Sequence, residues 1–176
     1  SSEILLSMDT QTGVTINTNA FIADNLVVEG NLVVNGTVTK QAIAFDCYNS
    51  QNNKTLTVKT TVIYDVIRYN SGHFTLNSTT GIVTFNTPMI AQVTFRISTG
   101  SDGGETRGYT AYINGISGSK VFMYNRNPWN ADQTGTATII KQFQTGDVIE
   151  IICERTVGTY PIITVAEACG LTIVGL

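Results

Sequence analysis

Charge is scarce in this sequence, and positive charge is the scarcer kind. The 176 residues carry 10 Lys and Arg against 13 Asp and Glu, which gives a net charge of −3. A nucleic-acid-binding domain shows a basic patch or stripe, and this chain has too few cations to build one. The chain also lacks an uninterrupted apolar run near the ~18 residues that a membrane-spanning helix needs. We therefore expect no nucleic-acid partner and no insertion into a membrane.

Side chains that bind metals or perform catalysis are equally sparse. The chain has one histidine, His73, and three cysteines, Cys47, Cys153 and Cys169. No Cys-x-x-Cys or His-x-x-x-His spacing exists, so zinc has no ligand set, and a lone histidine in a turn is a poor base for a nucleophile. The cysteines are expected to be small buried side chains of a protein assembled in a reducing compartment. The sequence thus predicts no catalytic residue, no metal and no cofactor, and the protein is expected not to be an enzyme.

The start of the chain carries no methionine and no basic-then-apolar signal segment. We expect a processed or truncated fragment whose missing N-terminal part joins it to something larger. What the chain has in abundance is Thr, Val and Ile, the β-branched residues that fit pleated sheets, with 16 Gly to form turns. The composition predicts an all-β protein.

A tandem repeat precedes Lys40. Residues 25–30 read Asn-Leu-Val-Val-Glu-Gly, and residues 31–36 read Asn-Leu-Val-Val-Asn-Gly. Alternate side chains of so thin a ribbon point to opposite sides, and one chain cannot bury both of them, so such repeats are stabilised by stacking on neighbours. We expect residues 1–40 to form an intertwined β stalk shared by several chains, although an ordinary hairpin of 26–28 against 32–34 is an alternative. The residues expected to trimerise this stalk are Leu26, Val28, Leu32, Val34 and Val38.

Residues 41–176 predict a separate globular head made of longer strands. Alternation of apolar and polar side chains is visible in 93–97, and Asn114-Gly115 is a strong hairpin signal. No stretch of ten residues carries a helical period. So many short strands predict a β-sandwich or jelly roll. The candidate strands are 42–48, 55–67, 81–85, 90–98, 108–113, 120–124, 135–143, 148–155 and 171–174.

Several short sequence motifs in residues 42–176 follow one another in an order that resembles the globular heads of complement component one-q. Residues 85–95 keep Phe, Pro and Phe at the spacings of the family's central signature, with Ala and Val where the family has Gly and Tyr. Residues 62–70, the turn at 145–149 and the ending 169–176 are also similar to successive family phrases. The resemblance covers residues 42–176.

This resemblance implies a jelly roll of the tumour-necrosis-factor type with about ten strands, assembled as a homotrimer. It implies that the last strand lies in the inner sheet at the trimer interface. Members of the family commonly carry a collagen stalk, but this chain has no Gly-X-Y run, and the six-residue repeat stands in its place. A thin β stalk that ends in a globular head is similar to the trimeric fibres of viruses and bacteriophages.

Two loops of the head hold the candidate receptor-binding residues. Residues 125–132 contain the only tryptophan, Trp129, among amides and charges that suit a sugar; the alternative is that this ring anchors its own loop or a neighbouring subunit. Residues 101–107 are rich in glycine and charge, but Asp102 and Glu105 are too few carboxylates for a calcium cage. The candidates are Asn125, Arg126, Trp129 and Asp132 in the first loop, with Asp102, Glu105 and Arg107 in the second.

Together these features predict the distal part of a trimeric fibre or spike on a virion surface. Its head would bind a host cell-surface receptor or glycan, and its missing N-terminal part would join a capsid or base protein. The alternative is a secreted or spore-surface head that works as a coat or pattern-recognition protein without enzymatic activity. A glycan-cleaving spike is a third hypothesis, which lacks any catalytic constellation in the sequence.

Overall fold

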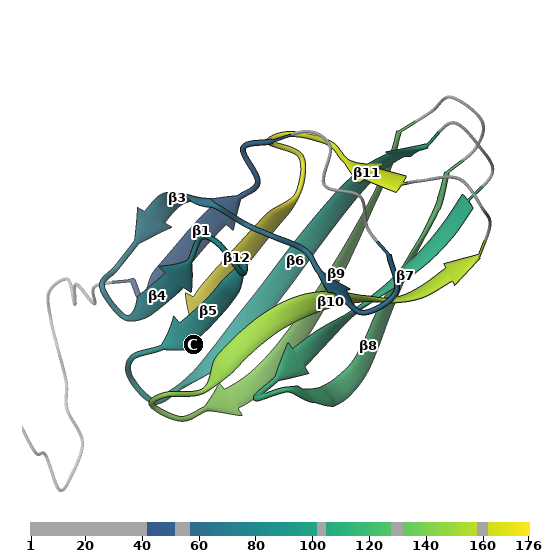
Figure 1. The fold of residues 1–176 in the computed structure, drawn as a ribbon. Helices are drawn as coiled ribbons and strands as arrows, with labels where there is room; N and C mark the ends of the chain where they lie inside the picture. Colours follow the sequence, from purple (N-terminus) through teal and green to yellow (C-terminus); the bar gives the residue numbers. More distant parts are fainter. Residues whose placement is uncertain (1–41, 52–56, 102–104, 128–131, 158–161) are drawn as a thin grey trace, which may run out of the picture. The chain divides into compact units, whose positions relative to one another are not determined.

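The computed structural model describes residues 42–51, 57–101, 105–127, 132–157 and 162–176. The chain divides into two units, Ser1–Thr39 and Lys40–Leu176. The described residues all belong to the second unit, which we call the head. They are drawn as coloured ribbon in Figure 1.

The described residues form twelve β-strands joined by turns and loops. Thr, Val, Ile and the aromatic residues dominate these segments because their side chains pack well on a pleated surface. In chain order the strands are β1 (Ala44–Tyr48), β2 (Thr60–Thr61), β3 (Val66–Asn70), β4 (Phe74–Asn77), β5 (Ile82–Phe85), β6 (Met89–Ser101), β7 (Glu105–Ile113), β8 (Ile116–Asn127), β9 (Gln133–Phe143), β10 (Val148–Val157), β11 (Ile162–Thr164) and β12 (Gly170–Gly175).

The strands build two antiparallel sheets that face each other as a sandwich (Figure 1). In sheet A, β1 lies between β3 and β12, and the long strand β6 pairs with β12 and β11 along one edge and with β9 along the other. In sheet B the order is β4-β5-β10-β7-β8, and β2 also pairs with β10. This is the jelly roll that the sequence predicted, with the last strand β12 inside sheet A.

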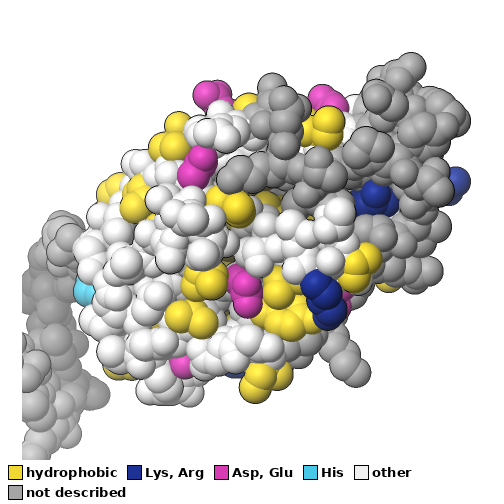
Figure 2. Space-filling model, in the orientation of Figure 1, with side chains coloured by type: hydrophobic (Ala, Val, Ile, Leu, Met, Phe, Trp, Pro, Cys, Tyr) yellow, Lys and Arg dark blue, Asp and Glu magenta, His cyan; other side chains and the backbone are white. Residues whose placement is uncertain are grey.

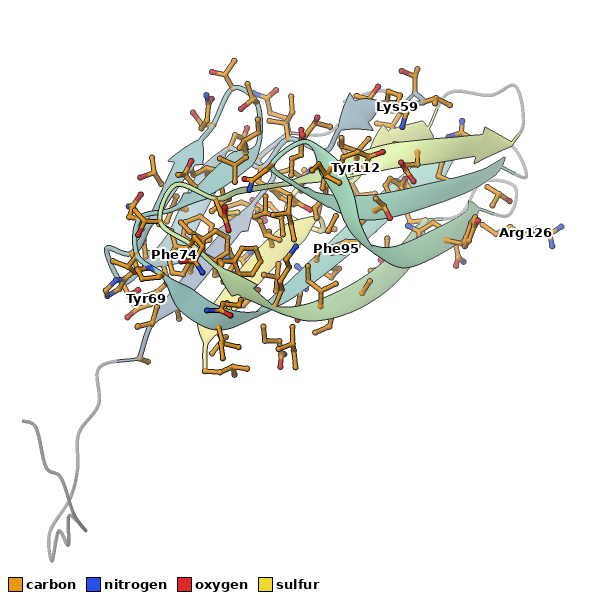
Figure 3. All side chains as sticks on the ribbon, turned by 90° about the horizontal axis from the view of Figure 1, so that it is seen from below. Lys59, Tyr69, Phe74, Phe95, Tyr112 and Arg126 are labelled. Atoms are coloured by element: carbon orange, nitrogen blue, oxygen red, sulfur yellow. The ribbon has the colours of Figure 1, made fainter. Side chains whose placement is uncertain are left out.

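Aromatic side chains fill the space between the sheets at one end of the sandwich. The rings of Phe85 and Phe143 stack with their centroids 3.9 Å apart, and Phe74 meets Phe85 edge-on at 5.4 Å. Phe45 continues the cluster from β1, with its centroid 5.5 Å from that of Phe74. Figure 3 shows Phe95 of β6 farther along the same interior. These rings bind sheet A to sheet B through β1, β4, β5 and β9.

The three cysteines are buried and free, as the sequence predicted. Burial raises the pKa of the Cys47 thiol well above its usual range, and burial raises the pKa values of Cys153 and Cys169 to about 11. Cys169 is also fixed by hydrogen bonds, because its Sγ donates to the Ser98 carbonyl at 3.2 Å. All three thiols are therefore neutral packing groups at physiological pH.

The hairpin between β7 and β8 turns at Asn114-Gly115, where the sequence predicted it. Both residues have positive φ, 53° and 74°, as a type I′ turn requires. The Asn114 side chain reaches the next turn, since its Nδ2 donates to Asp147 Oδ1 at 2.8 Å and its Oδ1 accepts from the Val148 amide at 2.9 Å. The two turns thus hold each other at this end of the sandwich.

The structure corrects the predicted strands in three places. The single strand expected over 55–67 is wrong, because among its described residues, 57–67, only Thr60–Thr61 and the start of β3 are strand. Val62 and Tyr64 between them are buried in the core. Two strands were missed, β4 and β11. The count of twelve against about ten comes from these short segments.

Candidate functional site

Sheet A has one face packed on sheet B and one face turned away from it, which we call the outer face. Side chains along β6 alternate between the two, as a strand requires. A residue of β9, β12 or β1 points to the same face of the sheet as the residue of β6 or β12 directly opposite it. The buried set on β6 is Ala91, Val93, Phe95 and Ile97.

Four large apolar side chains lie exposed together on the outer face. They are between 40% and 63% exposed. Pairing places Ile140 and Val174 on either side of Gln92 of β6, and the Leu176 amide donates to the Ile90 carbonyl at 2.9 Å. We call this set the apolar band: Ile90, Ile140, Val174 and Leu176.

The described chain enters the head beside the apolar band. Ala44 of β1 lies opposite Val174, and the Gly175 amide donates to the Ile43 carbonyl at 2.8 Å. Gly175 leaves room for this approach, since an added Cβ would lie 2.9 Å from Ile43 Cβ. Whatever precedes residue 42 therefore joins the head next to the exposed apolar side chains.

A row of hydroxyl groups crosses the outer face next to the apolar band. Thr138, Thr94, Thr172 and Asp46 lie opposite one another on four successive strands. The hydroxyls of Thr94 and Thr138 are 3.0 Å apart, and Thr172 Oγ1 donates to Asp46 Oδ1 at 2.9 Å. The outer face thus changes from apolar to polar along the strands.

Beyond the hydroxyl row the outer face carries two arginines. Arg68 Nη1 donates to Asp46 Oδ2 at 3.3 Å, and its guanidinium lies 4.5 Å from the Tyr48 ring centroid. Arg96 donates through Nε to the Ala168 carbonyl at 2.9 Å. A depression between these groups is lined by Asp46, Arg68, Thr94, Arg96, Thr136, Gly170 and Thr172.

The end of the sandwich away from the chain entry is where the predicted receptor-binding loops begin and end. The flanking strand ends pair with one another: Glu105 lies opposite Asn127, and Ser101 lies opposite Ile162. Figure 3 shows Arg126 at this end, pointing away from the sandwich, with Tyr69 and Phe74 at the other. We call it the distal end.

The candidate receptor residues are divided by the structure into exposed, buried and undescribed ones. Arg126 and Asp132 are exposed at the distal end. Asn125 and Arg107 are buried, so neither is presented at the surface of this chain. Asn125 Nδ2 donates to the Ile97 carbonyl at 2.9 Å, which makes it an internal link between β8 and β6.

The remaining candidates lie beyond what the structure describes. Trp129 and Asp102 fall outside the described residues, and of Glu105 only the backbone is described. The stalk residues Leu26, Val28, Leu32, Val34 and Val38 are outside them as well. The roles assigned to these residues, and to the loop that holds Trp129, stay predictions.

A polar cluster on the outside of sheet B was not predicted. Lys59 Nζ lies 3.0 Å from Tyr112 Oη and 3.3 Å from Glu154 Oε1, and the Tyr112 hydroxyl donates to Glu154. The hydrogen bond from Tyr112, followed by Lys59, holds the pKa of Glu154 below its usual range. Figure 3 shows Lys59 and Tyr112 close together, and Figure 2 shows acidic, basic and hydrophobic side chains mixed on the face turned to the viewer. The cluster attaches the segment before β2 to the sheet.

The apolar band and Arg96 were missed from the sequence although a signal exists. Met89-Ile90, Ile139-Ile140 and Ile173-Val174 each put two apolar residues in succession. In a strand one member of such a pair faces outward. An exposed apolar member in three strands of one sheet was therefore a signal for the apolar band.

The described residues also bear on metals and membranes. No group of three or more His, Cys, Asp or Glu side chains that could hold a metal ion occurs within the part of the chain that the structure describes. Across the same residues no helix is long and apolar enough to cross a membrane. The expected absence of a metal, a cofactor and an enzymatic activity remains a prediction.

Comparison with known proteins shows the fold but no sequence family. No family model and no curated protein matches the chain. Among solved structures, Eiger TNF from S. frugiperda matches with a TM-score of 0.57 at 14% identity, over 78% of this chain and 94% of that one. The globular domain of zebrafish complement 1qA protein matches with a TM-score of 0.57 at 12% identity, over 77% of this chain and 98% of that one. The head of this protein has the jelly-roll fold of tumour-necrosis-factor and complement one-q globular domains.

Proposed function

We propose that this chain is the distal part of a homotrimeric fibre or spike whose head binds a receptor on a host surface. In this proposal residues 1–40 form the shared stalk, and the outer face of sheet A packs against its copies. The distal end of each head then carries the recognition loops. A virus or phage particle is the proposed location.

The observation that carries the proposal is the apolar band beside the chain entry. Exposed apolar side chains gathered on one face mark an interaction site, and the occupant we propose is a second copy of this chain. The chain outside the described residues supports this choice, because residues 25–36 repeat a strand-forming hexapeptide that one chain cannot bury. Chains that share a stalk bring their entry points together, and each entry point lies next to an apolar band.

Replacement of one isoleucine tests the assembly. Ile140→Asp places a charge in the apolar band, where burial without a partner is costly, and we expect this variant to lose the trimer in sedimentation equilibrium. The matched control is Ile116→Asp, because Ile116 is 69% exposed at the tip of the β7–β8 hairpin of sheet B. This control should keep the trimer mass. A parent protein that sediments as a monomer at micromolar concentration, or an Ile140→Asp variant that stays trimeric, would contradict the proposed interface.

The receptor-binding part of the proposal is tested at the distal end. A glycan array and a panel of host cells are probed with the intact trimer, and then with Trp129→Ala and Arg126→Ala. Removal of a stacking tryptophan from a binding hot spot costs about 2 kcal/mol per site or more, and three linked heads amplify that loss. Lys59→Ala serves as the control because Lys59 belongs to the polar cluster of sheet B. Equal binding by the parent and both distal variants, each with unchanged melting temperature and mass, would place recognition elsewhere.

A secreted or spore-surface head without enzymatic activity is the alternative function, and the same screen separates it. Binding to microbial surfaces or coat proteins without binding to host cells would favour it over a viral or phage fibre. Release of sugar from the array would instead favour an enzyme and would contradict the proposed absence of activity.

A further inference from the structure

We propose that the depression around Arg96 binds an inorganic oxyanion that the three chains of the assembly share. This inference rests on the proposed trimer and adds a ligand to its interface. The depression has a volume of about 220 Å³ and lies on the polar half of the outer face. It is lined by Asp46, Arg68, Thr94, Arg96, Thr136, Gly170 and Thr172.

The charge of Arg68 is balanced within its own chain, and the charge of Arg96 is not. Asp46 accepts from Arg68 through Oδ2 and from Thr172 through Oδ1, so both of its oxygens are engaged. Within the described residues the ion pairs are Lys59–Glu154 and Arg68–Asp46, and Asp46 is the only carboxylate in the depression. Arg96 therefore lines the depression as a cation without a carboxylate partner in the described part of the chain.

The groups around Arg96 suit an oxyanion. Its Nε is occupied by the Ala168 carbonyl at 2.9 Å, which fixes the guanidinium and leaves its Nη groups as donors. Gly170 lies beside these groups, since a Cβ added there would be in ordinary contact with Nη2 at 3.5 Å. Thr136 lines the same depression, and so do Thr94 and Thr172, whose hydroxyls are engaged with Thr138 and Asp46. The two Nη groups of a guanidinium form a fork of donors that phosphate and sulfate oxygens accept from.

In the proposed trimer the three copies of Arg96 would lie close together around the shared axis. A residue that lies near a rotation axis meets its own copies across that axis. The outer face is the one proposed to pack against its copies, so the axis of the proposed trimer runs along this face. Strand β6 extends along the same face from Ile90 in the apolar band to Arg96 in the depression. Like charges that converge in a partly dry interface repel one another. The apolar band would close the interface next to the chain entry, and an anion among the three Arg96 side chains would neutralise the polar half.

Phosphate binding to the full-length protein tests the site. Isothermal titration of inorganic phosphate is run at constant ionic strength with the parent, Arg96→Gln and Arg126→Gln, and each sample is also examined by sedimentation equilibrium. We expect the parent trimer to bind one phosphate per three chains. We expect Arg96→Gln to weaken binding by about tenfold or more, because a charge-assisted hydrogen bond is lost in every chain. Arg126→Gln removes an exposed arginine at the distal end and should bind as the parent does.

Each outcome decides one of the two proposals. A parent trimer that binds no phosphate, or an Arg96→Gln trimer that binds as the parent does, overturns the anion site and leaves the trimer standing. One phosphate per chain overturns a site shared on the axis. A monomeric parent contradicts the proposed function itself, whatever its affinity for phosphate. Arg96→Lys provides a second test, because it keeps the charge without the fork and should give intermediate affinity.

Discussion

Gly72 and Gly81 both have a left-handed backbone, but only at Gly81 would an added side chain also collide with its neighbours. Gly72 has φ of 90° with nothing within 4 Å of an added Cβ, whereas at Gly81, with φ of 76°, the Cβ would lie 2.5 Å from the Val62 carbonyl oxygen. We expect Gly72→Ala to cost about 1 kcal/mol, the usual penalty for an L-residue in this region. Gly81→Ala should cost about 2 kcal/mol or more, because the backbone must also shift. Urea unfolding at neutral pH measures the unfolding free energy of both variants. Equal losses of unfolding free energy would show that the backbone at Gly81 shifts at little cost.

The pair of Tyr112 and Glu154 should make part of the stability depend on pH. The Tyr112 hydrogen bond is the first cause of the lowered pKa of Glu154. A lowered carboxyl pKa stabilises the folded state above the usual glutamate value of 4.5, and this stabilisation is lost as the pH falls through the folded value. Tyr112→Phe removes the donor and should cost about 0.5 to 1 kcal/mol at pH 7, since the site is open to solvent.

Urea unfolding of the parent and Tyr112→Phe across pH 7 to 3 tests this dependence. The difference in unfolding free energy between the two proteins should shrink as the pH falls below 4.5, the usual glutamate value. A difference that stayed constant over the whole range would mean that the hydroxyl stabilises the fold by packing rather than through the carboxylate.

At the scale of elements, the aromatic cluster is what joins the two sheets near the chain entry. Phe85 of β5 is fully buried, stacks on Phe143 of β9 and meets Phe74 of β4. We expect Phe85→Ala to lower the free energy of unfolding by about 3 to 5 kcal/mol, through lost burial and the cavity that remains. Ile67→Ala on the edge strand β3 is the control, because Ile67 is exposed, and it should change stability by less than about 0.5 kcal/mol. Equal effects in thermal or urea unfolding would show that the cluster can be repacked.

Strands of the head were predictable where turn chemistry and alternation agree. The hairpin at Asn114-Gly115 and the strand β6 follow from such local signals. β4 was missed because its four residues, Phe74–Asn77, are too few for a pattern between two turns. The segment 55–67 was misread because its run of β-branched residues suits a strand, yet contacts with the core place Val62 and Tyr64 between the sheets instead.

The candidate site was harder to predict than the fold. Which isoleucine of Ile139-Ile140 faces outward depends on the register of β9 against β6, and this register is not visible in one strand alone. Asn125 shows the converse error, because an amide in a polar loop sequence was expected at the surface but bonds to β6 inside the sandwich. Loop composition therefore indicated the distal end, but only the structure separates Arg126 from Asn125.

At the scale of the whole molecule, the described head has two ends with different chemistry. The chain entry, the C-terminal strand β12 and the apolar band lie at one end, and the strand ends that flank the predicted recognition loops lie at the other. This arrangement suits a head that is held at one end and exposed at the other. We expect a change in the proposed stalk to alter assembly without unfolding the sandwich.

The stalk is predicted to carry its apolar contacts on one face of the repeat. Leu32→Asp puts a charge on the face expected to point at the shared axis, and an ionised group buried there without a partner is costly. We expect this variant to lower the melting temperature of the trimer, while the circular dichroism of the β-rich head is retained. Val33→Asp is the matched control, because Val33 is the next residue of the same repeat and points to the opposite face. A clear difference between the two variants would support an axis lined by Leu26, Val28, Leu32, Val34 and Val38. Trimer melting that is unchanged in Leu32→Asp would favour the ordinary hairpin over the intertwined stalk, and the apolar band of the head would then have to hold the trimer alone.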